Sequence, residues 1–409
     1  MSAAASGKPR ASAPPHVPEE LIRAFDFDAE PGMNKCPHAA IAKLHEGPRI
    51  FYNTAAEARI GGGAWVPTRI EDLREILQTP EVFSAKGAGG FAALIGETWD
   101  LLPVEKDPPE HGEYRALLNP LFAPPRVKAM EDGVRARAVE LIEAFRARGS
   151  CDLVAEFAKP FPISIILQLL GLPSEKFDDL VLWATQLLHG RDLATKAQGC
   201  RSIATYLRQI IAERRAEPKD DLISYFISCK VFGRSPTDDE LLGIVFLLFG
   251  GGVDTVAASL GFYFKHLADH PDVQDRLRAD PALIPNAVEE FLRSFAIVTS
   301  TRRVVKDVHF KGVEMKAGDW VSISTQLACL DPDEFSSPLT VDIDRSPNRH
   351  QAFSFGVHRC VGSHLARREI AIALEEFLAR IPRFRVADGD AVQLHGGNLM
   401  GVDKLQLVW

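Results

Sequence analysis

The chain has 409 residues, and its hydrophobic fraction of 46% and charged fraction of 25% are typical of a large globular protein with an extensive core. The net charge of −8 at pH 7 argues against a nucleic-acid-binding role. Six cysteines, at positions 36, 151, 200, 229, 329 and 360, follow no disulfide framework, which predicts reduced thiols and a cytoplasmic location.

The first twenty residues are rich in Ala, Ser and Pro and lack the continuous apolar core of a signal peptide. We expect residues 1–20 to form a flexible N-terminal arm. Since no Pro- or Gly-rich linker divides the remainder, residues 21–409 are expected to form one domain.

Helical periodicity dominates the chain. Apolar residues at i, i+3 and i+4 predict helices near 68–78, 125–148, 151–171, 175–188, 195–216, 238–268, 272–279, 284–294 and 363–380. Short β-branched and aromatic stretches bounded by Gly or Asp predict strands at 64–67, 303–305, 308–310, 320–324 and 405–409. These elements predict a mainly α fold with small β-sheets at its edge.

The most apolar stretch is 241–253, which Asp254 interrupts. Because a bilayer-spanning helix needs roughly twenty apolar residues, we interpret this segment as a buried core helix and expect no membrane anchor. Three consecutive glycines, Gly250, Gly251 and Gly252, lie inside it, and each costs about 1 kcal/mol relative to alanine in a helix. Some function must compensate for that cost.

The segment Glu290-Phe-Leu-Arg293 places an acid and a base three residues apart, on one face of the predicted helix 284–294. Such a pair on a helix surface is usually a solvated ion pair of little energetic value.

The segment Phe353-Ser-Phe-Gly-Val-His-Arg-Cys360-Val-Gly362 surrounds one cysteine with aromatics and glycines. The helix predicted after it has an apolar face and would direct its N-terminal N–H groups at the sulfur, which suits a thiolate that binds a metal. That apolar face contains Leu365, Ile370, Ala373, Leu374, Phe377 and Leu378. A buried inert thiol is the ordinary alternative. A zinc site built on His358, Cys360 and His364 lacks a fourth ligand.

The pattern F-x-x-G-x-H-x-C-x-G followed by an amphipathic helix resembles the haem-binding loop of the cytochrome P450 superfamily. The order DPPEH, PFPISIILQLLGLP, GGVDT, EEFLR, FSFGVHRC and HLARREI is also similar to that of soluble bacterial camphor-type monooxygenases, from about Phe83 to the end. The resemblance implies the cytochrome P450 fold as a single haem domain, with haem b (iron protoporphyrin IX) as cofactor and Cys360 as the iron ligand.

The resemblance also implies roles for other residues. Thr255 would hydrogen-bond dioxygen at the iron and Asp254 would help relay protons, although Thr255 could instead only bond a carbonyl one turn back and kink the helix. Glu290 and Arg293 would form a buried structural pair beneath the haem loop, closed by Arg345, Arg349 or His350. The implied cofactor-binding residues are Cys360, Arg115, Arg302, His358, Phe353, Gly362, Gly251 and Gly252, of which Arg115, Arg302 and His358 would bind the haem propionates.

The substrate pocket departs from the camphor-type pattern. Trp99 stands where those enzymes have a tyrosine that bonds the ketone, Val104 replaces a hydroxyl-bearing residue, and Gly250 replaces a bulkier aliphatic one. The indole N–H of Trp99 could still donate, but the ring is larger. We expect a terpenoid or norisoprenoid substrate, such as an ionone-like ketone. Its predicted contacts are Trp99, Leu247, Gly250, Val298, Phe91 and Val104.

The resemblance further implies that dioxygen is the co-substrate and that electrons arrive from a two-iron two-sulfur ferredoxin, served by an NADH-dependent ferredoxin reductase. Arg74, Arg115 and Arg349 are predicted to make the surface near Cys360 basic enough for an acidic ferredoxin. We expect a monomer. A haem-thiolate peroxygenase and a non-catalytic haem-based sensor or carrier stay open as alternatives.

Overall fold

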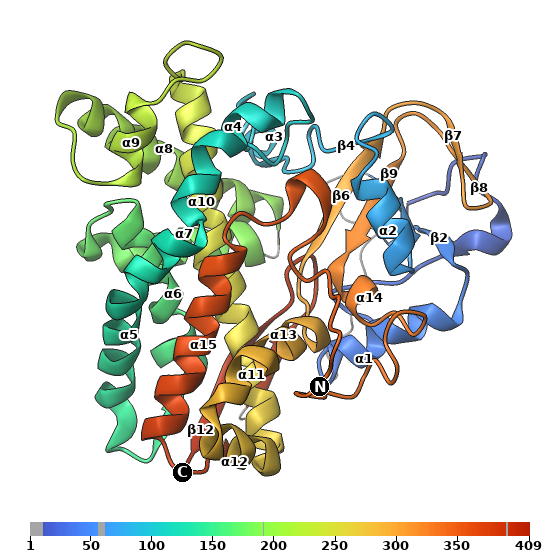
Figure 1. Cartoon of the computed structure of the whole chain (residues 1–409). Helices are drawn as coiled ribbons and strands as arrows, with labels where there is room; N and C mark the ends of the chain where they lie inside the picture. Colours follow the sequence, from blue (N-terminus) through green and yellow to red (C-terminus); the bar gives the residue numbers. More distant parts are fainter. Residues whose placement is uncertain (1–10, 56–61, 191, 390–391) are drawn as a thin grey trace.

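The computed structural model describes the chain apart from residues 1–10, 56–61, 191 and 390–391, so the first half of the expected arm lies outside the described residues. Long helices fill one side of the molecule and short-stranded sheets the other (Figure 1). The prediction of a mainly α fold with small sheets is confirmed.

The helices differ widely in length, and the longest ones form the side of the molecule away from the large sheet. They are α1 (Pro37–Ala42), α2 (Ile70–Leu77), α3 (Phe91–Leu94), α4 (Glu110–Leu118), α5 (Pro124–Arg146), α6 (Pro160–Leu169), α7 (Phe177–His189), α8 (Leu193–Ala216), α9 (Leu222–Ser228), α10 (Asp238–Val253), α11 (Thr255–Asp269), α12 (Pro271–Ala279), α13 (Ile284–Ser294), α14 (Thr325–Cys329) and α15 (Ser363–Arg380). Single turns separate several of them, among them η5 (Val154–Ala158) and η8 (Gly356–His358).

Three sheets lie beside the helices. The strands are β1 (Ile22–Arg23), β2 (Ile50–Asn53), β3 (Ala64–Pro67), β4 (Phe83–Ser84), β5 (Ser150–Asp152), β6 (Thr299–Val304), β7 (Val308–Phe310), β8 (Val313–Met315), β9 (Trp320–Ser324), β10 (Arg385–Val386), β11 (Val392–His395) and β12 (Gly401–Val408). The large sheet has the order β1-β2-β3-β9-β6-β4, a second sheet joins β10, β12 and β11 with β5 added to β12, and β7 pairs with β8. Among them only β3–β9 and β1–β2 run parallel.

The central core helix is divided in two. Thr237 and Glu240 form a capping box at the start of α10, and the chain bends at Asp254 before α11 begins. The predicted continuous helix 238–268 is therefore wrong at one residue. By length and composition the combined span Asp238–Asp269 could cross a membrane, but 67% of its most apolar window is buried inside the protein, as in a core helix.

The predicted helix 151–171 is wrong in its first half. Residues Ser150–Asp152 form β5 and pair with β12, and the turn η5 separates this strand from α6. The reason is Pro160, which lacks an N–H group and is tolerated in the first turn of a helix but not in its interior. The local apolar spacing alone did not show this break.

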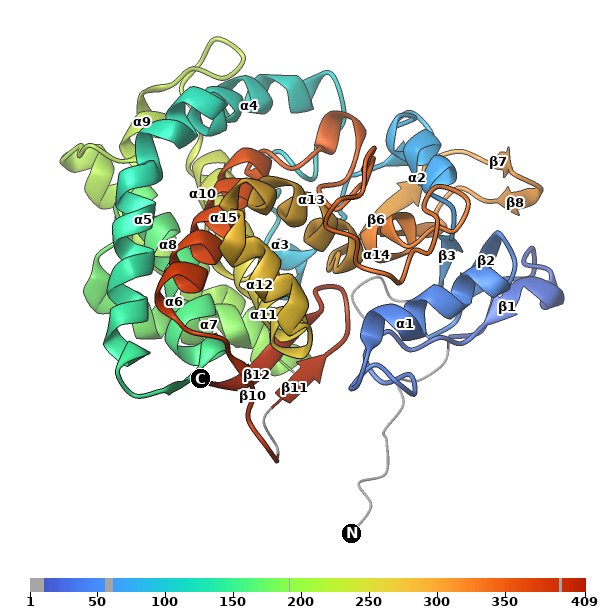
Figure 2. The same ribbon diagram turned by 60° about the horizontal axis from the view of Figure 1, so that its bottom comes forward.

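The apolar face predicted for the last long helix is buried in the core. All six of its predicted apolar residues on α15 are at most 7% exposed, and α15 packs along α5 (Figure 2). In the described half of the expected N-terminal arm, Val17 is 7% exposed and His16 lies 2.8 Å from Asp319, whereas Ser12, Pro15 and Pro18 are exposed.

Candidate functional site

The loop before α15 turns sharply around Cys360. The Cys360 N–H donates to the Phe353 carbonyl at 2.9 Å, which closes the loop. Gly356 has φ +67°, and a Cβ there would lie 2.8 Å from the Leu77 carbonyl oxygen, so this turn requires glycine. Gly362 caps α15, and a Cβ there would meet only the Cys360 sulfur, at 3.9 Å.

The Cys360 sulfur lies in an environment with opposing effects. Burial raises the pKa of the Cys360 thiol, whereas the Gly362 N–H and the positive charges of Arg115, Arg359 and Arg367 lower it, and burial wins. A metal cation would reverse that balance, because it deprotonates a coordinating thiol. Among the residues that the structure describes, no three His, Cys, Asp or Glu side chains are grouped to hold a metal ion. Within those residues, the ligand set of a zinc site is therefore not formed around Cys360.

The glycines of α10 fall into two kinds. A Cβ built on Gly250 or Gly251 meets no atom within 4 Å, so open space adjoins the helix there, and Gly251 is exposed although it lies in a core helix. Gly252 differs, because its Cβ would lie 2.7 Å from the Ile166 side chain of α6. This glycine therefore permits close packing of α10 against α6, and its role in cofactor binding stays a prediction.

Thr255 adopts the local bond that the sequence left open. Its hydroxyl donates to the Gly251 carbonyl at 2.8 Å, one turn back, where the helix bends. This bond uses the hydroxyl proton and leaves the oxygen lone pairs free to accept. Asp254 accepts a hydrogen bond from His189 at 2.6 Å and is 9% exposed.

Four basic side chains gather beside the cysteine loop. The His358 ring lies 4.4 Å from the His111 ring of α4, and the charges of Arg115 and Arg302 act on both. Burial, followed by these neighbouring charges, lowers the pKa of His358 to about 3; burial and Arg115 likewise lower that of His111 to about 4. Burial also lowers the pKa of Arg302 to about 10.

This basic cluster fits an anionic ligand. Within the described part of the chain, the Nε2 atoms of His358 and His111 are buried and have no hydrogen-bond partner. Buried donors without partners are rare in folded proteins unless a ligand or water pairs with them. The haem propionates would supply the missing charge and acceptors, so the residues present fit haem b. Sequence reasoning missed His111, although it lies one helical turn before Arg115.

Glu290 and Arg293 form a fully buried pair. The Arg293 Nε and Nη2 atoms donate to the two Glu290 oxygens at 2.8 and 2.7 Å, and both residues are 0% exposed. Arg345 closes the pair, with Nε 3.1 Å from each Glu290 oxygen, and Asn348 adds a bond at 3.0 Å. Of the three bases that the sequence left open, Arg345 is therefore the one. His350 bonds Glu289 instead.

Four of the six predicted substrate contacts lie in one apolar cluster. Trp99 is buried there, and Phe91, Val104 and Leu247 pack against it. Phe246, which sequence reasoning missed, lies 5.0 Å from the Trp99 ring and 5.7 Å from the Phe91 ring, measured between ring centroids. The other two predicted contacts are separate: Gly250 faces the open space beside α10, and Val298 packs against a different cluster.

The indole N–H of Trp99 is not free for a substrate. It donates to Glu97 at 2.6 Å, and Glu97 is held in turn by Arg208 of α8. The expectation that this N–H could bond a substrate carbonyl is therefore wrong for this arrangement. Glu105 fixes the same loop, because its carboxylate accepts hydrogen bonds from the N–H groups of Gly89, Gly90 and Leu101.

The three arginines predicted to contact a partner all touch the cysteine loop or the residues leading into it. Arg74 donates to the Arg349 carbonyl at 3.2 Å and lies over the Phe355 ring at 5.8 Å. Arg115 donates to the Arg359 carbonyl at 2.9 Å. The side chains of Arg349 and Arg359 are exposed beside them.

Comparison with known proteins gives one family throughout. Residues 163–394 match the family model described as cytochrome P450. A probable cytochrome P450 127A1 from Sinorhizobium fredii is 43% identical over 97% of this chain and 96% of its own length. A steroid C26-monooxygenase from Mycobacterium tuberculosis is 35% identical over 81% of this chain and 90% of its own length.

Solved structures agree with the sequence relatives. The crystal structure of cytochrome P450 CYP101C1 superposes with a TM-score of 0.87 at 36% identity and covers 97% of this chain and 100% of its own. The crystal structure of CYP101J2 gives a TM-score of 0.86 at 33% identity, with coverage of 98% and 100%.

Proposed function

Because the chain belongs to the cytochrome P450 family, whose members are haem b monooxygenases, we propose that it oxidises a small apolar terpenoid or norisoprenoid at a C–H bond with electrons from a ferredoxin. The observation that carries the proposal is that Cys360 and the open space beside Gly251 adjoin one apolar cluster. Val361 and Leu365, which follow Cys360 in the chain, pack in the same cluster as the apolar residues of α10.

The residues that would hold haem b are Cys360 at the iron and the basic cluster of His111, Arg115, Arg302 and His358 at the propionates. Haem b, when bound to a thiolate, supplies the iron at which dioxygen is activated. Cys360 is exposed at the surface of the loop, so haem b would cover the sulfur, and the Gly362 N–H donates toward it. The basic cluster would orient the cofactor, because the buried Nε2 atoms of His111 and His358 gain hydrogen-bond partners only when an anion lies against them.

Thr255 and Asp254 would serve proton transfer on the α10 side. Cleavage of dioxygen to release water requires two protons, so this chemistry needs a hydrogen-bond acceptor and an acid near the open space. Thr255 keeps its lone pairs available because its proton is engaged by Gly251. Asp254 directly precedes Thr255 in the chain, and although burial would raise the pKa of Asp254, the hydrogen bond and charge of His189 lower it.

An apolar substrate is supported by what lies around Trp99. The indole N–H is engaged by Glu97, and Phe91, Leu247 and Val104 add only apolar surface. A pocket without a free donor rewards shape and burial rather than a polar group on the substrate. We therefore propose that a hydrocarbon or cyclic ether of suitable shape binds about as well as a ketone.

A ferredoxin would dock on the cysteine loop. Arg349 and Arg359 are exposed there, and Val357 is 42% exposed between them. A small apolar centre within a basic rim is suited to an acidic partner. With the soluble bacterial structures that resemble it, this feature supports a cytoplasmic, ferredoxin-dependent enzyme.

Reconstitution with a ferredoxin and its NADH-dependent reductase tests the proposal. The expected result is an oxygenated terpenoid product. Titration with β-ionone and with the matching hydrocarbon should each shift the Soret band, and the two dissociation constants should differ by less than about three-fold. Binding without any oxygenated product would support a sensor or carrier instead. Turnover with peroxide alone, at a rate equal to the ferredoxin-driven rate, would support a peroxygenase.

A further inference from the structure

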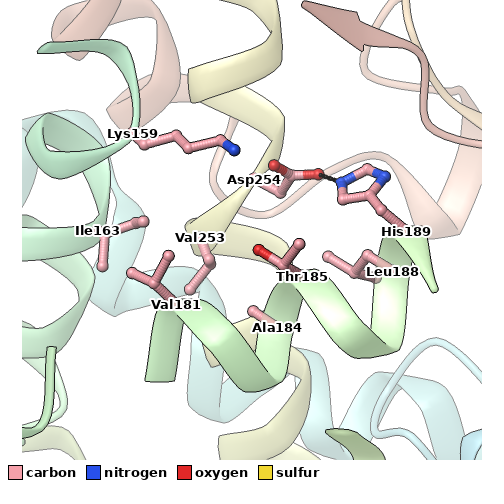
Figure 3. A pocket seen from close by; sticks show the side chains of 9 residues that line it. All are labelled: Lys159, Ile163, Val181, Ala184, Thr185, Leu188, His189, Val253 and Asp254. Carbon is pink, nitrogen blue, oxygen red and sulfur yellow. Dashed lines mark hydrogen bonds and ion pairs between the residues drawn. The ribbon is translucent and has the colours of Figure 1, made fainter. Parts of the chain in front are cut away.

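Asp254 lies at the inner end of a series of titratable side chains. Its Oδ2 atom is 2.6 Å from His189 Nε2, at the end of α7 (Figure 3). The His189 ring lies edge-on to that of His395 in β11, with 4.5 Å between ring centroids. His395 is hydrogen-bonded through Nδ1 to Asp403 of β12 at 3.0 Å. Four titratable groups, from the bend between α10 and α11 and from α7, β11 and β12, thus lie in one series.

Exposure increases along this series. The side chain of Asp254 is 12% exposed, those of His189 and His395 are 21% and 24% exposed, and that of Asp403 is 47% exposed. Asp254 is therefore reached from solvent through His189. Of the described residues, His395 also has a buried Nε2 atom without a hydrogen-bond partner.

A small cavity adjoins the His189–Asp254 pair. It measures about 10 Å³, which is close to the space that one water molecule needs. Lys159 and Thr185 contribute polar groups to its wall, and Figure 3 shows the Lys159 amino group directed toward Asp254. The remaining lining is apolar, so a water there would bond only these four polar residues.

The charges around the series favour an ionised Asp254. Burial alone would raise the pKa of Asp254, but the hydrogen bond from His189 and the charges of His189, His395 and Lys159 lower it. The pKa of Asp403 is also lowered, first by its hydrogen bond from His395, against burial. A carboxylate held in this way recovers a proton readily only from a neighbour that can release one.

We infer that His189 supplies protons to Asp254 and positions it, with His395 and Asp403 holding the His189 ring. After Asp254 has passed on a proton, the Nε2 proton of His189 moves along the hydrogen bond to Asp254 Oδ2 while Nδ1 takes up a proton from solvent water, so the ring gains one proton for each that it gives. Exchange with solvent water then returns the ring proton from Nδ1 to Nε2. This inference rests on the proposed relay role of Asp254.

The substitution His189→Gln separates proton supply from positioning, since glutamine keeps a hydrogen-bond donor but does not titrate. With saturating ferredoxin, reductase and substrate, we expect the oxygenation rate to fall about ten-fold and the solvent deuterium isotope effect to rise. The matched control is His309→Gln, which changes a 65% exposed histidine paired with Glu314 and should leave both quantities unchanged.

The infrared band of the protonated Asp254 carboxyl group gives a readout that does not require turnover. Asp254→Asn identifies this band, because the substitution removes it. The band should appear at higher pH in His189→Gln than in the unsubstituted enzyme, because His189 holds down the pKa of Asp254. If the band appears at the same pH in both, or if the rate and isotope effect of His189→Gln are unchanged while Asp254→Asn is slow, the inference is overturned. A full rate in Asp254→Asn would overturn the relay role of Asp254 itself.

Should His189→Gln fail to bind haem, His395→Gln provides the second variant. It keeps the His189–Asp254 bond and removes the neighbouring imidazole. A smaller rate loss with a raised isotope effect is expected, and an unchanged rate and isotope effect would overturn the inference.

Discussion

Arg367 donates from Nε and Nη2 to the two oxygens of Glu289, at 2.6 and 2.9 Å, and its guanidinium lies 4.5 Å from the centroid of the Phe353 ring. Glu289 also bonds His350 at 2.9 Å. Glu289 of α13 is therefore connected to His350 directly, and through Arg367 to the start of α15 and to Phe353 at the beginning of the cysteine loop. Its neighbour Glu290 binds the chain between Asp342 and Asn348. Two adjacent glutamates thus fix successive parts of one loop.

Replacing Arg367 by alanine should loosen the cysteine loop. The variant loses a bidentate ion pair and a cation over Phe353, for which we expect about 2–4 kcal/mol of lost stability and faster haem release. Haem transfer to apomyoglobin measures the release rate. The matched control is Arg368→Ala on the same helix, which is about as exposed as Arg367 but pairs with Glu131 of α5 and Glu375 of α15 instead of Glu289 of α13. Equal haem release rates in the two variants would contradict the account.

Replacing Arg302 by leucine should change haem affinity and apoprotein stability in opposite directions. Arg302 is 5% exposed, and burial lowers its pKa to about 10, so its charge is costly until an anion binds. We expect haem affinity to fall about 10- to 100-fold and the apoprotein to unfold at a higher temperature. Haem titration and thermal unfolding of the apoprotein are the two measurements.

The matched control for this prediction is Arg303→Leu. Arg303 is adjacent on β6 but exposed, and lies over the Trp320 ring at 5.7 Å. Haem affinity should stay within about two-fold of the unsubstituted protein. A loss in Arg303→Leu as large as in Arg302→Leu would refute the assignment of Arg302 to the cofactor.

Glu369 on α15 predicts a specific pH dependence of stability. Burial raises the pKa of Glu369 from 4.5 to about 8. Between these values the unfolded chain releases the proton that the folded chain retains, so stability falls as pH rises, by up to about 1.4 kcal/mol per pH unit. Glu369→Gln should remove this dependence and unfold at a higher temperature at pH 7.5. The variant Glu375→Gln, at a half-buried glutamate of the same helix that pairs with Arg135 and Arg368, should keep the dependence. Identical profiles in all three proteins would disprove the prediction.

Local patterns predicted most of the long helices and the central chemistry of the site. The predicted helix 363–380 corresponds to α15, and the strands at 64–67, 308–310 and 320–324 correspond to β3, β7 and β9. These segments have strong periodicity or turn residues at both ends. The arginine that closes Glu290 could not be chosen from sequence, because Arg345, Arg349 and His350 lie within six residues and differ only in the path of the loop.

The residues that sequence reasoning missed all act through tertiary contacts. His189 and His395 are 206 residues apart in sequence, and only the tertiary fold brings the end of α7 beside β11. Only the ring of His358, 4.4 Å away, marks His111 as part of the site. Trp99 was correctly predicted to lie among apolar residues, but its N–H partner Glu97 depends on how α8 crosses the loop.

The central claim is that Cys360 ligates the iron of an oxygen-inserting enzyme, and turnover under isotopically labelled dioxygen tests it most directly. With ferredoxin, reductase and an apolar terpenoid, we predict a product that carries one labelled oxygen atom. The ferrous protein should also show the absorption band of carbon monoxide bound opposite a thiolate, and Cys360→His should abolish both signals. Product oxygen that comes from water, or full turnover in Cys360→His, would contradict the account.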